Sequence, residues 1–131
     1  MNDSRKQAGM AVRTEVLGED HVRRAAAATT PFTADFQDLL TRYAWGDVWS
    51  RPGLDRRSRS LITVAMLASL GCTEELALHV RAALRNEVTE QELAETLLQV
   101  AVYAGVPRAN TAFAVAQRAL EDNAPRTGSG A

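Results

Sequence analysis

The fold is decided by the stretch Gly53-Leu54-Asp55-Arg56-Arg57-Ser58-Arg59-Ser60-Leu61-Ile62-Thr63-Val64-Ala65-Met66-Leu67-Ala68-Ser69-Leu70-Gly71. Asp55 is typical of a helix N-cap, and Gly71 is typical of the residue that ends a helix. Between them, residues 61 to 70 are apolar on nearly every side of the expected helix, which predicts burial all round. Because a chain of 131 residues can hardly cover such a helix by itself, we expect a close-packed homo-oligomer.

A second helix is expected directly afterwards, with Thr73 as its N-cap and Asn86 at its end. His79 falls on the apolar stripe of this helix, and Glu75 lies one turn before it. An imidazole on an apolar face can exchange protons near neutral pH, and a neighbouring carboxylate can orient it. His79 and Glu75 are therefore candidate catalytic residues. A core histidine with a satisfied hydrogen bond is the alternative interpretation.

The rest of the chain is also helical in pattern, and no segment alternates with a period of two, so the predicted fold class is all-α. Gly18 divides residues 12 to 28 into two short helices, and an aromatic helical pattern runs from Phe32 to Trp49. Thr89 to Glu92 has the spacing of a capping box, and Pro107 opens a last helix. We expect one helical domain over residues 11 to 122, with disordered tails at residues 1 to 10 and 123 to 131.

Charge and cysteine content argue against several classes of function. The 15 basic and 16 acidic residues are interspersed and give a net charge of -1, so we expect neither nucleic acid nor an anionic membrane as a partner. The single Cys72 cannot form a disulfide within the chain, which favours a reducing cytoplasm. No apolar run is long enough to span a membrane. Glu75 and His79 offer only two ligands, so no metal site is expected.

Four segments of the chain stand out as ordered motifs: Tyr43-Ala44-Trp45-Gly46-Asp47-Val48-Trp49-Ser50-Arg51-Pro52-Gly53-Leu54, Arg56-Arg57-Ser58-Arg59-Ser60-Leu61, Leu78-His79-Val80-Arg81-Ala82-Ala83-Leu84 and Tyr103-Ala104-Gly105-Val106-Pro107-Arg108-Ala109-Asn110. They resemble the carboxymuconolactone decarboxylase family, and the likeness extends over roughly residues 12 to 120. The resemblance implies the helical fold of alkylhydroperoxidase-D-like proteins, assembled as a trimer or a hexamer. It also implies cofactor-free decarboxylation of 4-carboxymuconolactone to 3-oxoadipate enol-lactone, in the protocatechuate branch of the β-ketoadipate pathway.

The substrate that the resemblance implies has two carboxylates and an unsaturated lactone that can itself take up the electrons, so no cofactor is expected. His79 would then donate to the developing oxyanion or supply a proton, with Glu75 orienting it. An arginine fork suits the carboxylate that is kept, and surface ion pairs explain the same arginines without any ligand. The candidate substrate-binding residues are Arg51, Arg81, Arg85, Trp45, Trp49 and Tyr103.

The peroxidase branch of the same superfamily carries a Glu, eleven residues, and then Cys-x-x-Cys-x-x-x-His. With its histidine placed on His79, Cys72 matches the first cysteine, whereas Glu75 stands at the second and Ser60 at the upstream glutamate. Without the second thiol the dithiol couple is missing, which argues against peroxide reduction. Two alternatives to a decarboxylase remain: a thiol-dependent redox enzyme that uses Cys72, and a non-catalytic helical oligomer.

Overall fold

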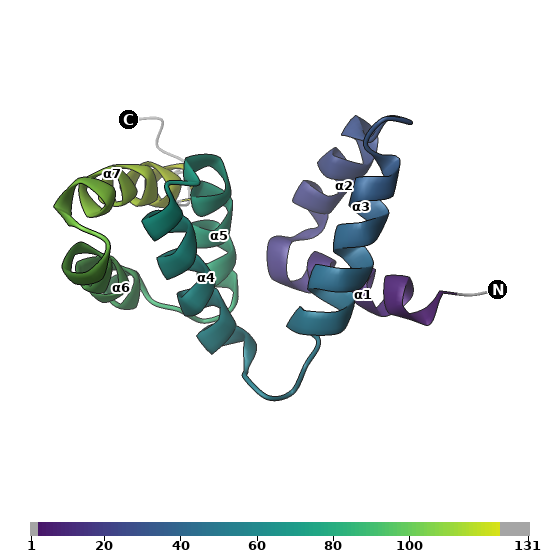
Figure 1. Cartoon of the computed structure of the whole chain (residues 1–131), viewed down its shortest axis with the longest axis horizontal. Helices are drawn as coiled ribbons and strands as arrows, with labels where there is room; N and C mark the ends of the chain where they lie inside the picture. The colour runs from purple at the N-terminus through teal and green to yellow at the C-terminus, as the bar shows by residue number, and fades with distance from the viewer. Residues whose placement is uncertain (1–2, 124–131) are drawn as a thin grey trace, which may run out of the picture. The chain divides into compact units, whose positions relative to one another are not determined.

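The computed structural model describes residues 3 to 123, and over this range the chain is helical without any β-strand (Figure 1). The all-α prediction is therefore confirmed for the described part of the chain. The chain divides into two compact units, one up to Arg59 and one from Ser60 onward. The prediction of a single domain from residue 11 to residue 122 stays a prediction. None of the helices in the described range is long and apolar enough to cross a membrane.

The first unit contains four helical segments. They are α1 (Ser4–Leu17), α2 (Glu19–Ala28), α3 (Ala34–Leu40) and the π-helix η1 (Thr41–Trp49), which continues α3 without a break. Gly18 separates α1 from α2 with a positive φ of 94°, as predicted from the sequence, because glycine adopts this backbone conformation at no steric cost. The main packing contact of this unit is between α1 and η1.

The prediction of a disordered tail over residues 1 to 10 is wrong for the residues that the structure describes, because α1 begins at Ser4. Asp3 caps this helix, and its side chain accepts a hydrogen bond of 3.1 Å from the backbone N–H of Lys6. Gly9 is buried where α1 crosses η1, and a Cβ atom there would lie 2.9 Å from the Gly46 nitrogen. The glycine that suggested a loose tail in fact permits close helix packing.

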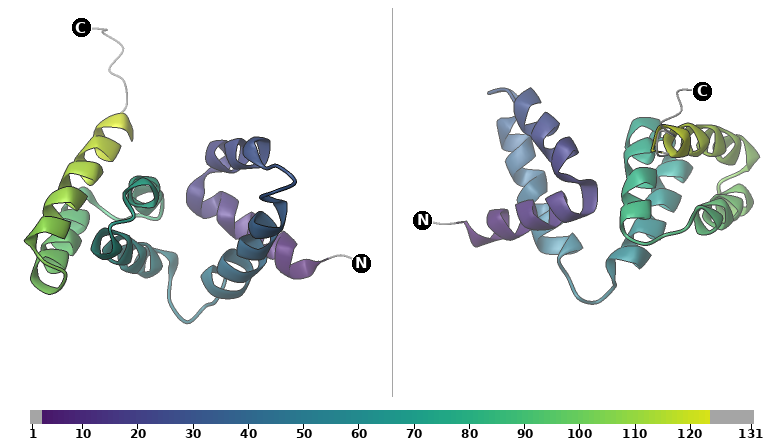
Figure 2. Two further views of the ribbon diagram at one scale, coloured as in Figure 1. Left: turned by 45° about the horizontal axis from the view of Figure 1, so that its top comes forward. Right: turned by 180° about the vertical axis from the view of Figure 1, so that it is seen from behind.

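The second unit is built from α4 (Arg56–Leu70), which begins just before the boundary, α5 (Thr73–Arg85), α6 (Glu90–Tyr103) and α7 (Val106–Asn123). In Figure 2, α7 runs beside α5, and α7 packs on both α5 and α6. Large side chains of the core come from α5 and α6, namely Leu76, Val80, Leu93 and Leu97. The tail predicted for residues 123 to 131 falls outside the described residues, apart from Asn123, which ends α7.

The predicted ends of these helices are mostly confirmed. The backbone N–H of Ser58 donates to the Asp55 carboxylate at 2.6 Å, and Gly71 ends α4 with a φ of 75°. The capping box between Thr89 and Glu92 is present in both directions, at 2.9 and 3.1 Å. The prediction of Thr73 as an N-cap is wrong, because Cys72 occupies that position and Thr73 is the first residue of α5.

The prediction that α4 is buried on every side is wrong within this single chain. Val64 and Ala68 are buried, whereas Ile62, Met66 and Leu70 are 42%, 58% and 71% exposed. The continuous helix of α3 and η1 is also buried on one face only, since Trp45 is buried while Phe36 and Tyr43 are exposed. A chain of this size has too few residues to cover both faces of each helix. The structure therefore leaves apolar helix faces open.

Candidate functional site

The two predicted catalytic residues lie on α5, one turn apart. Leu76, Val80 and Ala83 hold this helix in the core, and His79 lies at the edge of that buried face, half-buried, with its Nδ1 atom inaccessible to solvent. Glu75 is exposed in the first turn of the same helix. The imidazole is thus held by packing on one side while part of the side chain stays open to solvent, an environment in which it can exchange protons.

Arg81 lies two residues after His79 on α5 and lines a groove between α5 and α7 with a volume of about 510 Å³, whereas His79 and Glu75 are not among the residues that line it. Arg118 of α7 lines the same groove, and within the described residues neither guanidinium has a carboxylate partner. Small apolar side chains, Ala77, Ala114 and Val115, also line it, and so do the acidic residues Glu74 and Asp122. Two arginines without acidic partners beside an apolar surface are typical of a site for an organic anion.

Arg85 does not line this groove. It is exposed in the last turn of α5, although its spacing of four residues from Arg81 predicts that both lie on one face. Arg118, in contrast, lines the groove but is not among the site residues predicted from the sequence. Its signal is positional: Thr111, Val115, Arg118 and Asp122 recur every three or four residues along α7 and line the groove together.

The buried face of α7 is made of Ala109, Ala112, Ala116 and Ala119. Small alanine side chains indicate a buried face less clearly than a large apolar residue does, yet Phe113 on the same helix is 37% exposed.

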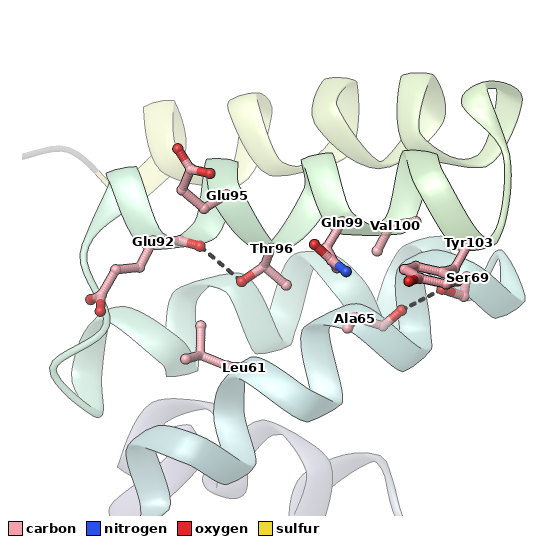
Figure 3. Close-up of a pocket in the computed structure, with 9 residues that line it drawn as sticks. All are labelled: Leu61, Ala65, Ser69, Glu92, Glu95, Thr96, Gln99, Val100 and Tyr103. Carbon is pink, nitrogen blue, oxygen red and sulfur yellow. Dashed lines mark hydrogen bonds between the residues drawn. The ribbon is translucent and has the colours of Figure 1, made fainter.

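Tyr103 lies at another groove, between α4 and α6, with a volume of about 470 Å³ (Figure 3). Leu61, Ala65 and Val100 give this groove an apolar surface, while Glu92 and Glu95 line it with carboxylates. Tyr103 itself is 82% exposed. Among the described residues, no basic side chain lines this groove to offset its two carboxylates, whereas Arg81 and Arg118 offset Glu74 and Asp122 in the other groove, so the groove that contains Arg81 suits an organic anion better.

The remaining predicted site residues, Trp45, Trp49 and Arg51, belong to the first unit. The two indole rings stack with their centroids 5.0 Å apart, and Trp45 is 5% exposed. Arg51 is exposed, and its carbonyl oxygen accepts a hydrogen bond of 3.2 Å from the Arg59 guanidinium. Trp45 is therefore a core residue of its unit. Trp49 is half-buried, so more of its indole is accessible to a ligand.

Within the described residues, the fold does not assemble a cluster of side chains for thiol or metal chemistry. Cys72 is half-buried at the N-cap of α5, and it is the single cysteine of the chain. Within residues 3 to 123, no three His, Cys, Asp or Glu side chains gather in a way that could hold a metal ion.

The sequence is similar to several known proteins. Residues 34 to 118 match the profile of the Carboxymuconolactone decarboxylase family. A 4-carboxymuconolactone decarboxylase from Acinetobacter baylyi is 48% identical over 93% of this chain and 92% of its own length. A nitrosuccinic acid decarboxylase from Metarhizium robertsii is 46% identical over 87% of this chain and 80% of its own length. A shorter 4-carboxymuconolactone decarboxylase sequence from Pseudomonas putida is 46% identical over 33% of this chain.

Proposed function

Because the chain belongs to the carboxymuconolactone decarboxylase family, we propose that it converts 4-carboxymuconolactone into 3-oxoadipate enol-lactone and carbon dioxide. The observation that carries this proposal is the 48% identity to the Acinetobacter baylyi enzyme over 93% of this chain and 92% of that enzyme. The identity extends over nearly the whole of both chains, so the similarity is not confined to one segment.

The chemistry needs a carboxylate that leaves and an electron sink beside it. When carbon dioxide departs from the ring carbon, its bonding electrons move through the ring alkene to the lactone carbonyl and form a dienolate. A proton added to the ring carbon next to the carbonyl then gives the enol-lactone, so one proton is taken up for each carbon dioxide released. The protein has to stabilise the dienolate oxygen and deliver that proton.

We assign the proton-delivery role to His79, with Glu75 as its positioning residue. The half-buried imidazole at the edge of the apolar face of α5 supports this assignment. For the acetate carboxylate of the substrate we propose Arg81, because the groove that this arginine lines also presents apolar surface and a second guanidinium. His79 does not line this groove, and side chains two positions apart on a helix point to different faces, so the two residues would act on one substrate only from adjoining protomers of the proposed oligomer. The roles of Arg51, Arg85, Trp45, Trp49 and Tyr103 as substrate contacts stay predictions.

Nitrosuccinate is a second candidate substrate, since the Metarhizium robertsii relative at 46% identity is named for it. Both compounds carry two carboxylates, lose one of them, and hold an electron sink beside the carbon that loses it: a conjugated lactone in one and a nitro group in the other. A site that binds the retained carboxylate and protonates a carbanion would serve both reactions.

The test is to incubate the purified protein with 4-carboxymuconolactone and, separately, with nitrosuccinate, and to measure carbon dioxide release together with the organic product. We expect the lactone to have the higher kcat/KM. If nitrosuccinate is turned over faster, the proposed substrate is wrong and the family chemistry stands. If neither compound releases carbon dioxide above the buffer control, the decarboxylase proposal fails.

The thiol-dependent alternative is not favoured, because two relatives that align with 93% and 87% of the chain are both named decarboxylases. A Cys72→Ser variant with unchanged turnover would dispose of it.

We further propose a homo-oligomer, supported by the open apolar faces of α3 and α4, and sedimentation analysis of the purified protein tests it. The cytoplasmic location expected from the single Cys72 also stays a prediction, and fractionation of the producing cells tests it.

A further inference from the structure

The first unit buries an arginine that has no acidic partner among the described residues. Arg13, in α1, is 7% exposed. Its guanidinium donates one hydrogen bond of 3.3 Å to the hydroxyl of Thr41 and one of 3.2 Å to the side-chain oxygen of Gln37. Both acceptors are neutral, so the two bonds satisfy donors without compensating the charge.

The guanidinium has further donors to offer. It carries five N–H groups, and the bonds to Thr41 and Gln37 use one on each terminal nitrogen. The Nε atom has no hydrogen-bond partner within residues 3 to 123. Burial lowers the pKa of Arg13 below its ordinary value, yet a guanidinium stays charged in proteins. A buried cation without a counter-ion is unfavourable, and an anion placed next to it would remove that penalty.

A cavity of about 240 Å³ lies at this arginine, between α1, α2 and the α3–η1 helix. Arg13 and both of its acceptors, Gln37 and Thr41, line it. Lys6 and Asp38 line it as well and form an ion pair of 2.8 Å with each other. Because Lys6 neutralises the single carboxylate among the lining residues, the positive charge of Arg13 remains as the net charge of the cavity.

We propose that this cavity is a binding site for a small oxyanion, a carboxylate or a phosphate, whose oxygens accept hydrogen bonds from the remaining N–H groups of Arg13. The planar fork of a guanidinium matches two oxygens of such an anion. The volume has room for a small anion and excludes a nucleotide. The bound anion supplies the missing counter-ion, so it also stabilises the first unit against unfolding.

The experiment compares three forms of the full chain: the wild type, Arg13→Met and the control Arg24→Gln. Arg13→Met keeps the length of the side chain and removes its charge. Arg24 is an exposed arginine of α2 that does not line the cavity. The thermal unfolding midpoint is measured against inorganic phosphate, and in a second series against succinate, with ionic strength held constant by sodium chloride.

We expect the midpoint of the wild type and of Arg24→Gln to rise saturably with at least one of the two anions, and the apparent affinity of Arg13→Met to be at least tenfold weaker. The series with the steeper rise identifies phosphate or carboxylate as the preferred ligand. An apparent affinity that changes less than twofold in Arg13→Met, or a wild-type midpoint that depends on neither anion, overturns the proposal.

A second measurement covers the case in which Arg13→Met does not fold. In the wild-type protein, the Nε–H resonance of Arg13 is assigned through its proximity to Thr41 and followed by NMR during the same two titrations. We expect the resonance to shift and to saturate with the preferred anion. A resonance that does not move with either anion overturns the proposal.

Discussion

The substitution Gly9→Ala tests whether α1 packs on η1 as the structure has it. In a solvent-exposed helix this change stabilises by about 1 kcal/mol, because alanine has the higher helix propensity. At Gly9 the added methyl group would overlap the Thr41 carbonyl oxygen and lie 2.9 Å from the Gly46 nitrogen. Ordinary contacts of this kind begin near 3.4 Å, so the backbone of η1 would have to retreat by half an ångström or more.

Overpacking of this kind costs about 1–3 kcal/mol, and backbone atoms yield less readily than side chains, so the upper part of this range applies. After subtraction of the gain in helix propensity, we expect a net loss of about 2 kcal/mol in the free energy of unfolding. With a urea dependence of about 2 kcal/mol per molar, the unfolding midpoint falls by about 1 M. Far-UV circular dichroism in a urea titration measures it.

Gly53→Ala is the matched control, because a Cβ atom at Gly53 meets nothing within 4 Å and the change should stay within about 0.5 kcal/mol. A Gly9→Ala variant that is as stable as the wild type or more stable would refute the packing of α1 on η1. It would also restore the prediction, made from the sequence, that residues 1 to 10 are a loose tail.

Three further predictions concern the site and one helix cap. His79→Gln should fold and assemble as the wild type does and lose about 100- to 10,000-fold in kcat for 4-carboxymuconolactone; wild-type turnover would remove His79 from the mechanism. Arg81→Gln should raise KM more than it lowers kcat, with Arg81→Lys in between, and equal KM values in all three forms would place the substrate carboxylate elsewhere. The backbone hydrogen bond from Ser58 lowers the pKa of Asp55 below its ordinary value of 3.8. The stability that this carboxylate provides is therefore fully present above pH 3.8, and it disappears as the pH falls through the lower pKa of the folded state. Asp55→Ala should therefore have a lower melting temperature than Asp55→Asn and the wild type at pH 7, and its deficit relative to the wild type should shrink in acid; a deficit that does not depend on pH would rule out the cap as its cause.

The ends of the helices in the second unit could be predicted because each depends on one or two residues that act locally. Gly71 ends α4 with a left-handed backbone conformation that favours glycine. Thr89 and Glu92 cap the N-terminus of α6, because the side chain of each accepts a hydrogen bond from the backbone N–H of the other. The stripe of Leu93, Leu97 and Val100 on α6 is buried as its spacing predicts.

Gly9 and the alanines of α7 could not be placed from the sequence, because the packing of a small residue depends on which segment lies against it. Gly9 resembles a tail residue until η1 is placed against it. The alanines of α7 form its buried face because they allow close approach of α5 and α6, whereas Phe113 on the same helix is 37% exposed. Helical spacing gives the faces of a helix, and the partner decides which of them is buried.

By itself, the sequence determined the fold class, the position of His79 one turn after Glu75, and the family, because these depend on periodicity and on ordered motifs along the chain. Only the tertiary structure decided that Arg81 shares a groove with Arg118, 37 positions further along the chain, and that Arg13 is buried beside neutral acceptors. Charge and spacing are local properties of a sequence. Burial and the absence of a counter-ion arise only when distant segments pack together.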